Sequence, residues 1–333
     1  MTAKDISFVI PVYNRPEETE ELLNSLSMMD GDKAFEVVIV EDGSSISSEK
    51  IVNQFSDILN ISYYFKPNSG PGDSRNYGMR KAKGDYFIIL DSDCIMPSSY
   101  MESVLKALNR QYIDCFGGPD AAHHSFSNIQ KAINFSMTSV LTTGGIRGRK
   151  NSVDTFQPRS FNMGISRPAF EATGGFGKIH PGEDPDLSIR LWKKGFKTTL
   201  FTEAFVYHKR RISWSKFYKQ VHKFGLARPI LNKWHPETMK LTYWFPLLFA
   251  LGLMIGLIFM CFEVYYITYL YLIYFVSCFL LSFTESKSIT VAMLSIWAIM
   301  IQFFGYGYGF LNATYKLTFS NKKAEELLPQ MFF

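Results

Sequence analysis

Apolar and polar positions divide the chain into two parts of different character. Up to about residue 240, short apolar runs alternate with amphipathic stretches, whereas residues 241–311 are almost continuously apolar and aromatic. In the first part, strand patterns alternate with helix patterns, the strands at 6–13, 35–45, 61–68 and 85–93 and the helices at 15–29, 47–59 and 72–83. Apolar strands joined by helices predict a parallel sheet that is covered on both faces. Such a sheet binds ligands beyond the carboxyl ends of its strands, which is where the motifs YNRP, EDGSS and DSDC fall.

The stretch from 115 to 210 predicts mixed structure with long loops. Residues 182–197 read as a helix with acidic residues at its start and basic residues at its end, as the helix dipole favours. In residues 213–227, four aromatic or apolar residues recur at helical spacing with lysines between them: Trp214, Phe217, Val221 and Phe224. This pattern predicts a helix lying in a membrane interface. The alternative is an ordinary surface helix that packs on the preceding domain.

Three apolar segments follow, at about 241–262, 264–284 and 289–311, and each is close to the length that spans a bilayer. The net charge is +5, and much of the excess lies in residues 190–240, which predicts an integral protein of the cytoplasmic membrane whose first part lies on the cytoplasmic side. Nucleic acid is the other usual partner of such a basic stretch, but the neighbouring apolar segments explain the charge better. Three full spans would put the three lysines of the tail, residues 312–333, outside, whereas two spans plus a re-entrant or interfacial segment would keep them inside. Segment length favours three spans.

The cysteines and the first residues of the chain predict no additional structural feature. The four cysteines, Cys94, Cys115, Cys261 and Cys278, are far apart and form no C-x-x-C pair, so neither a disulfide framework nor a zinc site is predicted. A reducing cytoplasm is the expected setting of the first part. The opening apolar run, ISFVIPVY, is too short for a signal peptide.

Four charged residues at predicted strand ends and in a predicted helix are candidates for chemistry. Asp91 and Asp93 follow a buried strand, and two such carboxylates can hold Mg²⁺ or Mn²⁺ and, through it, a diphosphate; the alternative is a helix cap or Asx turn. Asp42 could accept a hydrogen bond from a base or ribose, although EDGSS alone predicts only a turn. Arg75 carries a rigid donor fork suited to phosphate or to a carboxylate, with a surface ion pair as the alternative.

A second acidic pair, Glu183 and Asp184, opens the predicted helix 182–197. Acidic residues in the first turn of a helix commonly serve as capping groups. A carboxylate in this position can also act as a general base, which takes the proton from an attacking hydroxyl group. The residues alone leave both interpretations open.

The segments FVIPVYNRPEE, VVIVEDGSS, SRNYGMRKAKGDYFIILDSD, FNMGISRPAFEATGGF and GEDPDLSIRLWKKGFK together resemble the family 2 glycosyltransferases. The resemblance covers about residues 5–210 and implies the GT-A fold, a Rossmann-like mixed α/β sheet flanked by helices. It implies a catalytic domain over 1–210, with a nucleotide-sugar half at about 1–115 and an acceptor half at about 116–210. An amphipathic interfacial helix and linker (211–240) and an α-helical membrane region (241–311) would follow.

The resemblance implies a role for each matching residue in an inverting, metal-dependent transfer of a sugar from a nucleotide-sugar donor. Asp184 would be the general base, with Glu183 beside it. Asp93 and His208 would bind Mn²⁺ or Mg²⁺, with Asp91 as a further ligand; the alternative for His208 is a partly buried structural histidine. The donor would be bound by Pro11, Tyr13, Asn14, Asp42, Arg75, Asp91, Ser92 and Asp93. Gly174, Gly175 and Phe176 would shape the acceptor side, and Trp192 could offer its ring to a sugar, with a core tryptophan as the alternative. Arg210 and Arg211 could neutralise diphosphate or lipid headgroups.

One departure from the family pattern narrows the expected activity. Processive members carry Q-x-x-R-W on an interfacial helix, whereas this chain has Gln220 followed by Lys223 and Phe224. We therefore expect one sugar per encounter, from a UDP-sugar to a lipid-linked or cell-surface glycan acceptor in polysaccharide or glycoconjugate biosynthesis. A polyprenyl-phosphate glycosyltransferase and a catalytically silent nucleotide- or sugar-binding membrane scaffold are the alternatives. A nucleotidyltransferase is disfavoured because PVYNRPEE lacks the glycines of a phosphate loop.

Overall fold

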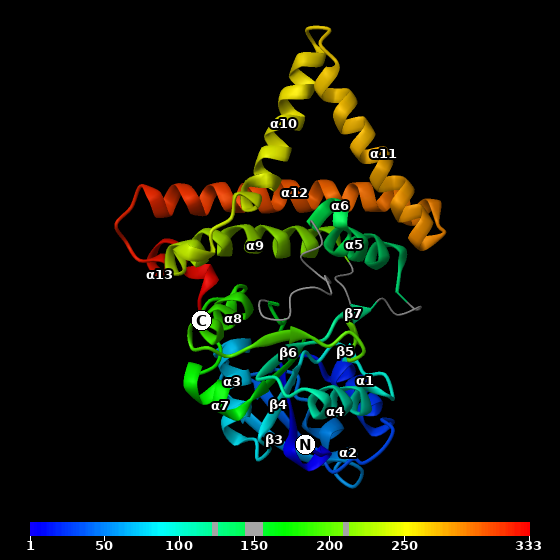
Figure 1. Cartoon of the computed structure of the whole chain (residues 1–333), viewed down its shortest axis with the longest axis vertical. Coiled ribbons are helices and arrows are strands. Elements are labelled where there is room, and N and C mark those ends of the chain that lie inside the picture. Colours follow the sequence, from blue (N-terminus) through cyan, green and yellow to red (C-terminus); the bar gives the residue numbers. More distant parts are fainter. Residues whose placement is uncertain (122–125, 144–155, 209–212) are drawn as a thin grey trace. The chain divides into compact units, whose positions relative to one another are not determined.

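The apolar runs of the N-terminal part form one mixed sheet of seven strands (Figure 1). Its strand order is β3-β2-β1-β4-β8-β6-β9. The strands are β1 (Ile6–Val12), β2 (Glu36–Asp42), β3 (Asn60–Lys66), β4 (Tyr86–Leu90), β6 (Cys115–Gly117), β8 (Asn162–Ser166) and β9 (Thr198–Leu200). β1, β2, β3 and β4 run parallel, and β8 runs antiparallel to both β4 and β6. The prediction of a mixed GT-A-type sheet is therefore confirmed.

Helices cover both faces of this sheet because its strands are apolar on both sides. In β1, Phe8 and Ile10 join the core beneath α1 (Pro16–Ser27), α2 (Glu49–Gln54) and α4 (Tyr100–Arg110). Val9, which points the other way, joins the core beneath α3 (Pro71–Lys81), α7 (Arg167–Thr173) and α8 (Glu183–Lys193). Alternate residues of a strand face opposite sides of a sheet, so two buried faces give the near-continuous apolar runs seen in the sequence.

A second, smaller sheet lies at the end of β4. It has the order β5-β10-β7 and consists of β5 (Cys94–Ile95), β10 (Val206–His208) and β7 (Asp120–Ala121). β10 pairs antiparallel with β5, and His208 stands opposite Cys94. This register brings His208 next to the Asp91–Asp93 turn.

The computed structural model describes residues 1–121, 126–143, 156–208 and 213–333, and the chain divides into two units. The first unit holds the two sheets and comprises Met1–His123, Gly148–Lys209 and Phe333. The second unit comprises His124–Arg147 and Arg210–Phe332. Its described elements are α5 (Asn128–Thr138), α6 (Val140–Thr143), α9 (Trp214–Trp234), η2 (Pro236–Thr238), η3 (Leu241–Trp244), α10 (Phe245–Met260), α11 (Tyr266–Ser286), α12 (Ile289–Thr318), α13 (Ala324–Leu327) and η4 (Pro329–Met331).

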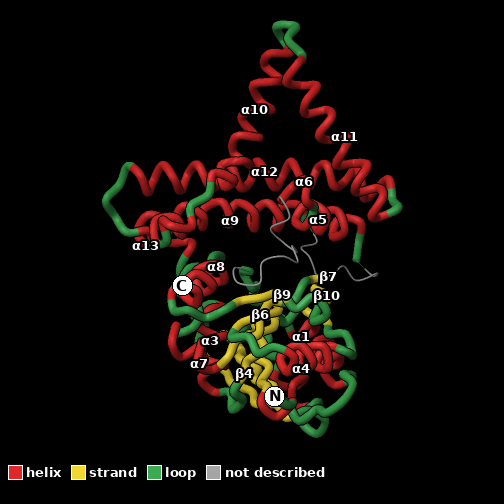
Figure 2. The backbone as a smooth tube through the Cα atoms, in the orientation of Figure 1, coloured by secondary structure: helices red, strands yellow, loops and turns green. Residues whose placement is uncertain are grey.

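Within the second unit, α9 runs alongside α12, and α10 and α11 form a hairpin that projects to one side of α12 (Figure 2). Glycines allow α9 and α12 to come close together. A Cβ on Gly309 of α12 would stand 2.3 Å from the His222 carbonyl oxygen of α9, and a Cβ on Gly225 of α9 would stand 2.2 Å from the Tyr306 carbonyl oxygen. Small residues of this kind let helix backbones approach in membrane proteins.

Three helical segments are long and apolar enough to cross a membrane: Leu241–Met260, Tyr266–Ser286 and Ile289–Thr318. They match the three predicted apolar segments, and the third continues seven residues beyond its predicted end at 311. Much of the apolar surface of α11 is exposed, for example at Tyr266, Leu270 and Ile273. An exposed apolar hairpin of this kind suits lipid rather than water.

The division into units differs from the expected one at α5 and α6. The expected catalytic domain covered 1–210, whereas α5 groups with the C-terminal helices. Its side chains Ile133 and Met137 pack against Phe217 and Val221 of α9 and against Ala298 of α12. An amphipathic helix needs an apolar partner, and α9 and α12 supply it.

Candidate functional site

The predicted donor-side motifs lie together along one edge of the large sheet. β1 stands between β2 and β4 and runs parallel to both, so the carboxyl ends of the three strands share that edge. YNRP follows β1, EDGSS follows β2 and DSDC follows β4. The sheet topology thus gathers side chains that are 30 to 80 residues apart in the sequence.

Asp93 carries two positively charged or protonatable partners. Arg15 Nη1 donates to Asp93 Oδ2, and His208 Nε2 lies 3.1 Å from Asp93 Oδ1. Burial acts to raise the pKa of Asp93, but His208 and Arg15 outweigh it and hold this pKa well below its usual range. The imidazole of His208 stacks on the Phe161 ring at 4.8 Å between centroids, which fixes its orientation. Asp93 is therefore an anion.

This group of residues fits a divalent cation. The ligand atoms of Asp93, Cys94 and His208 lie within 4.8 Å of one another. Burial raises the pKa of the Cys94 thiol well above its usual value, and its Sγ hydrogen-bonds the Phe161 carbonyl oxygen, so Cys94 stays a thiol. His208 Nδ1 is buried without a hydrogen-bond partner among the described residues. Carboxylate oxygen and imidazole nitrogen are ligands that Mn²⁺ accepts.

Arg75 is buried and links the two acidic motifs. Its Nη2 donates to Asp91 Oδ1 at 2.7 Å, and its Nη1 donates to Glu183 Oε1 at 3.3 Å. The guanidinium carbon lies 5.3 Å from the centroid of the Phe176 ring. Only 3% of Arg75 is exposed, so the alternative of a surface ion pair is wrong. Although burial opposes its charge, Asp91 and Glu183 raise the pKa of Arg75 further and keep it a cation.

Glu183 and Asp184 begin α8 side by side, but their environments differ. Glu183 is buried and accepts from Arg75, and His180 Nδ1 lies 2.8 Å from Glu183 Oε1. Burial acts to raise the pKa of Glu183, yet the hydrogen bond and charge of His180 and the charge of Arg75 lower it below its ordinary value. Glu183 is thus held as a carboxylate.

One carboxylate oxygen of Asp184, unlike that of Glu183, has no donor among the described residues to stabilise its negative charge. Its Oδ1 is buried and has no hydrogen-bond partner in the part of the chain that the structure describes. Burial first, and then the negative charge of Glu183, raise the pKa of Asp184 to about 6, even though Arg75 and the Ser160 backbone N–H act in the opposite direction. A carboxyl group with this pKa can take up or release a proton near neutral pH.

Asp42 forms a second polar cluster on the same sheet edge. Its carboxylate accepts from Lys66 Nζ at 2.6 Å and from the backbone N–H groups of Ser69 and Gly70, both at 3.0 Å. These bonds anchor the loop between β3 and α3 to the end of β2. Base recognition by Asp42 stays a prediction, and it would have to share the carboxylate with these donors.

The other predicted donor-side residues surround these clusters. Pro11 lies in β1 opposite Val40, and Ser92 is buried between the two aspartates of DSDC. Tyr13 is 53% exposed. Asn14, at a left-handed φ of 53°, accepts through Oδ1 from Ser45 N at 2.8 Å and Ile46 N at 3.0 Å, and so ties the β1 loop to the β2 loop.

The predicted acceptor-side residues fall into two places. Gly174 and Gly175 turn the chain after α7 with positive φ, and a Cβ on Gly175 would stand 2.1 Å from Asn76 Oδ1. Phe176, which follows, is buried against Arg75. Trp192 lies at the far end of α8, and its Nε1 donates to Thr198 Oγ1 at 2.9 Å. Phe176 therefore lies against Arg75, which binds Asp91 and Glu183, whereas the hydrogen bond described for Trp192 goes to Thr198.

Two residues of this centre were not predicted, namely Arg15 and His180. Arg15 belongs to YNRP, and its position at a strand end beside DSDC could have indicated a role. His180 precedes Glu183 by three residues, which is a weak signal. Arg210 and Arg211, which were predicted to neutralise phosphate, lie outside the described residues.

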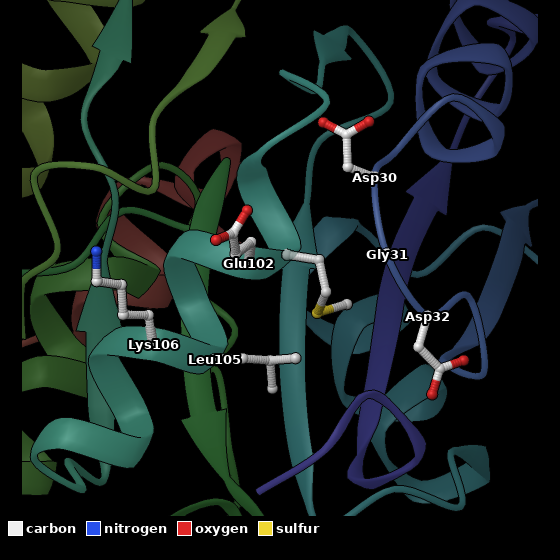
Figure 3. Close-up of a pocket in the computed structure, with 7 residues that line it drawn as sticks. Asp30, Gly31, Asp32, Glu102, Leu105 and Lys106 are labelled. Atoms are coloured by element: carbon white, nitrogen blue, oxygen red, sulfur yellow. The ribbon is translucent and has the colours of Figure 1, made fainter.

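A separate pocket in the first unit contains none of these residues (Figure 3). It lies between the loop after α1 and helix α4, and it is lined by Asp30, Gly31, Asp32, Met101, Glu102, Leu105 and Lys106. Its three carboxylates face solvent around a small apolar floor, and we assign it no function.

Comparison with known proteins covers both parts of the chain. Chondroitin synthase of Escherichia coli is 29% identical over 236 residues, which is 61% of this chain and 34% of that protein. Poly(ribitol-phosphate) beta-N-acetylglucosaminyltransferase TarS of Staphylococcus aureus is 32% identical over 111 residues, or 32% of this chain and 19% of that protein. Among solved structures, the mannosyltransferase PcManGT from Pyrobaculum calidifontis, in complex with GDP-Man and Mn²⁺, superposes over 98% of this chain and 79% of its own, with a TM-score of 0.53 and 13% identity.

The matches span only part of the length of each relative. They cover about a third or less of TarS and chondroitin synthase, and 14% of an uncharacterized glycosyltransferase of Rickettsia bellii. The family profile, by contrast, matches residues 7–173, half of this chain, and includes the ends of β1, β2 and β4. The chain therefore belongs to glycosyl transferase family 2.

Proposed function

We propose that this protein transfers a sugar from a nucleotide-sugar donor to an acceptor hydroxyl, with inversion at the anomeric carbon. The observation that carries the proposal is Asp184, a carboxyl group with a buried, unpaired oxygen and a pKa of about 6, beside a Glu183 that is held as an anion. One proton-accepting group near neutral pH is what a single-displacement transfer requires.

In the proposed step, Asp184 takes the proton from the acceptor hydroxyl. The acceptor oxygen forms its bond to the anomeric carbon while the bond from that carbon to the diphosphate oxygen breaks, so the electron pair leaves with the nucleoside diphosphate. Glu183 does not accept this proton, because Arg75 and His180 stabilise its charge. Its role is to raise the pKa of Asp184 and, through Arg75, to hold Asp91 in place.

On the donor side, Asp93 and His208 would hold Mn²⁺ or Mg²⁺, with Asp91 close by. The ion would supply positive charge to the leaving diphosphate. Asp91, the further proposed ligand, forms an ion pair with Arg75. Pro11, Tyr13, Asn14, Asp42 and Ser92, which line the same sheet edge, would position the nucleotide.

We propose UDP-sugars as the first donors to test and a glycan or lipid-linked molecule at the membrane as the acceptor. The names of two relatives, a poly(ribitol-phosphate) transferase and chondroitin synthase, support a polymer-related acceptor. Three helices that could cross a membrane support an acceptor close to the bilayer. Lys223 and Phe224 stand where processive enzymes have Arg and Trp, so we propose one addition per encounter.

We propose that the catalytic unit faces the cytoplasm. Lysines on α9, including Lys216, Lys219 and Lys223, supply the positive charge expected on that side. Because α12 runs alongside α9, a placement of both in the interface would leave only the α10–α11 hairpin to cross the bilayer. The exposed Cys261, at the tip of this hairpin, is a natural reporter. A membrane-impermeant maleimide added to intact cells should label Cys261 and leave a Cys261→Ser variant unlabelled.

The transfer itself is tested by the stereochemistry of the product. Detergent-purified protein is incubated with α-linked UDP-sugars, Mn²⁺ and membrane lipid extract, and the product anomer is read by NMR. A β-linked product supports inversion, and an α-linked product would rule out a single displacement with Asp184 as base. A product on polyprenyl phosphate would identify the polyprenyl-phosphate alternative, and donor binding without any product would favour the silent scaffold.

A further inference from the structure

Arg15 lies where the loop after β1 meets the loop after β4. The two strands are parallel neighbours, and their carboxyl ends bring Arg15 Nη1 to Asp93 Oδ2 although the residues are 78 positions apart. The contact follows from the sheet topology. It places a guanidinium on the carboxylate that was predicted to hold a metal ion.

The backbone of Arg15 is firmly held, whereas its side chain has access to solvent. The Arg15 carbonyl oxygen accepts from Thr19 N at 3.0 Å and from Thr19 Oγ1 at 2.7 Å. The preceding Asn14 is bonded to the loop after β2. The Arg15 side chain is 31% exposed, against 14% for Asp93. The guanidinium can therefore leave Asp93 while the anchor of the side chain stays fixed.

A basic side chain lies beside each carboxylate oxygen of Asp93, although Oδ1 makes no hydrogen bond among the described residues. Oδ2 accepts from Arg15, and Oδ1 lies 3.1 Å from His208 Nε2. A largely buried carboxylate requires positive charge beside it, because an unpaired buried charge is costly. A divalent cation bound by Asp93 and His208 would supply that charge and would compete with Arg15 for the same carboxylate.

We propose that Arg15 is the counter-cation of Asp93 in the metal-free site, that a divalent cation displaces it, and that the released guanidinium then binds the donor diphosphate. The inference rests on the proposed donor site. A guanidinium is well suited to this exchange, since its planar donor fork binds carboxylate and phosphate oxygens alike. Arg15 would thus weaken metal binding to the empty protein and strengthen nucleotide binding once the metal is present.

The first part of the proposal, displacement of Arg15 by the metal ion, is tested by titrating the full-length protein in detergent with Mn²⁺ alone. Free Mn²⁺ is followed by electron paramagnetic resonance. Arg15→Gln should bind Mn²⁺ about tenfold more tightly than wild type, the size expected for loss of one competing charge-assisted hydrogen bond. Arg80→Gln is the matched control, because Arg80 is exposed and pairs only distantly with Asp73, at 3.9 Å. Asp93→Asn should lose the binding and so locate it.

The second part of the proposal, binding of the diphosphate by the released Arg15, is tested by calorimetry with UDP and with GDP at saturating Mn²⁺. Arg15→Gln should bind the preferred diphosphate about tenfold more weakly than wild type and the Arg80→Gln control. Tighter metal binding together with weaker nucleotide binding distinguishes the exchange from a purely structural role, which would weaken both. Thermal unfolding of each variant verifies that it is folded.

An Mn²⁺ affinity of Arg15→Gln within twofold of wild type, or below it, would overturn the proposal, as would unchanged Mn²⁺ binding by Asp93→Asn. Unchanged diphosphate affinity would overturn the second part alone. These readouts need neither acceptor nor turnover. Transfer can therefore be established while the role of Arg15 fails, and the exchange can be established in a protein that transfers no sugar.

Discussion

Replacing Asp184 by asparagine should abolish transfer and, at neutral pH, make the protein more stable. The carboxyl group is placed where its charge is unfavourable: its Oδ1 is buried without a partner among the described residues, and Glu183 adds negative charge beside it. Asparagine keeps the shape, can still accept from the Ser160 backbone N–H, and carries no charge. A base that is useful for catalysis is thus expected to cost stability.

The magnitude follows from the pKa. A rise of the Asp184 pKa from 3.8 to about 6 corresponds to about 3 kcal/mol at 1.36 kcal/mol per pH unit, and about 2 kcal/mol remains after allowance for the partial exposure of the residue. A carboxyl group whose pKa is higher in the folded protein favours folding while it is protonated. This contribution is complete below pH 3.8 and is lost as the pH rises through about 6. At pH 7.5 the charged form therefore opposes folding, and its removal should stabilise.

The assay is thermal unfolding in detergent at pH 7.5 and pH 4.5. A gain of about 2 kcal/mol should raise Tm by about 4–8 °C at pH 7.5, and the gain should fall to about a third of that at pH 4.5, which lies between the unfolded and folded pKa values. Glu183→Gln, one residue away on the same helix turn, is the control with the opposite sign. The pKa of Glu183 is lowered by His180 and Arg75, so its charge stabilises above its unfolded pKa, and its removal should cost about 3 kcal/mol at pH 7.5. If Asp184→Asn lowers Tm at pH 7.5 as Glu183→Gln does, the electrostatic reasoning is refuted.

Three further outcomes are expected. Asp93→Asn should weaken Mn²⁺-dependent donor binding at least tenfold, as measured by calorimetry; an affinity equal to that of wild type both with Mn²⁺ and with chelator would remove Asp93 from the metal site. Arg75→Met should lower the free energy of unfolding by about 3–5 kcal/mol, because two carboxylates lose their buried partner, and an unchanged urea midpoint would contradict this. Gly309→Leu should expose α9 and α12 to proteolysis, since even a Cβ would stand 2.3 Å from the His222 carbonyl oxygen; digestion at the wild-type rate would argue against close packing. Leu311→Ala, an exposed position on α12, should be digested as wild type is.

The features that depend on local pattern could be predicted from the sequence. Buried strands and covering helices have distinct periodicities, so β1, β2 and β4 and the motifs at their ends were expected where they lie. The three apolar segments were expected for the same reason, and only the end of the third differs.

The pairing of charged residues could not be predicted, because it depends on contacts distant in sequence. Arg75 could have been a surface residue, and its burial follows from Glu183, 108 positions away, and from the Phe176 ring. Arg15 stands in a motif that was read for its aromatic and amide neighbours, and its contact with Asp93 requires the β1–β4 pairing.

The sequence also does not show which surface an amphipathic helix packs against. α5 has an apolar face with Ile133 and Met137, which would suit the cover of a sheet as well as a helical bundle. It lies within the expected catalytic domain of residues 1–210, so its place among the C-terminal helices was not expected. The apolar stripes of α9 and α12 provide the larger complementary surface, and α5 packs there.

The most direct test is the release of nucleoside diphosphate from a panel of nucleotide sugars by wild type and Asp184→Asn, side by side, with Mn²⁺ or chelator and membrane lipid extract as the source of acceptor. We predict Mn²⁺-dependent release from one donor by wild type, and no release by Asp184→Asn although it binds the same donor with similar affinity. Release by Asp184→Asn at the wild-type rate would contradict its role as the base. Failure of both proteins to bind any donor would contradict the proposed function.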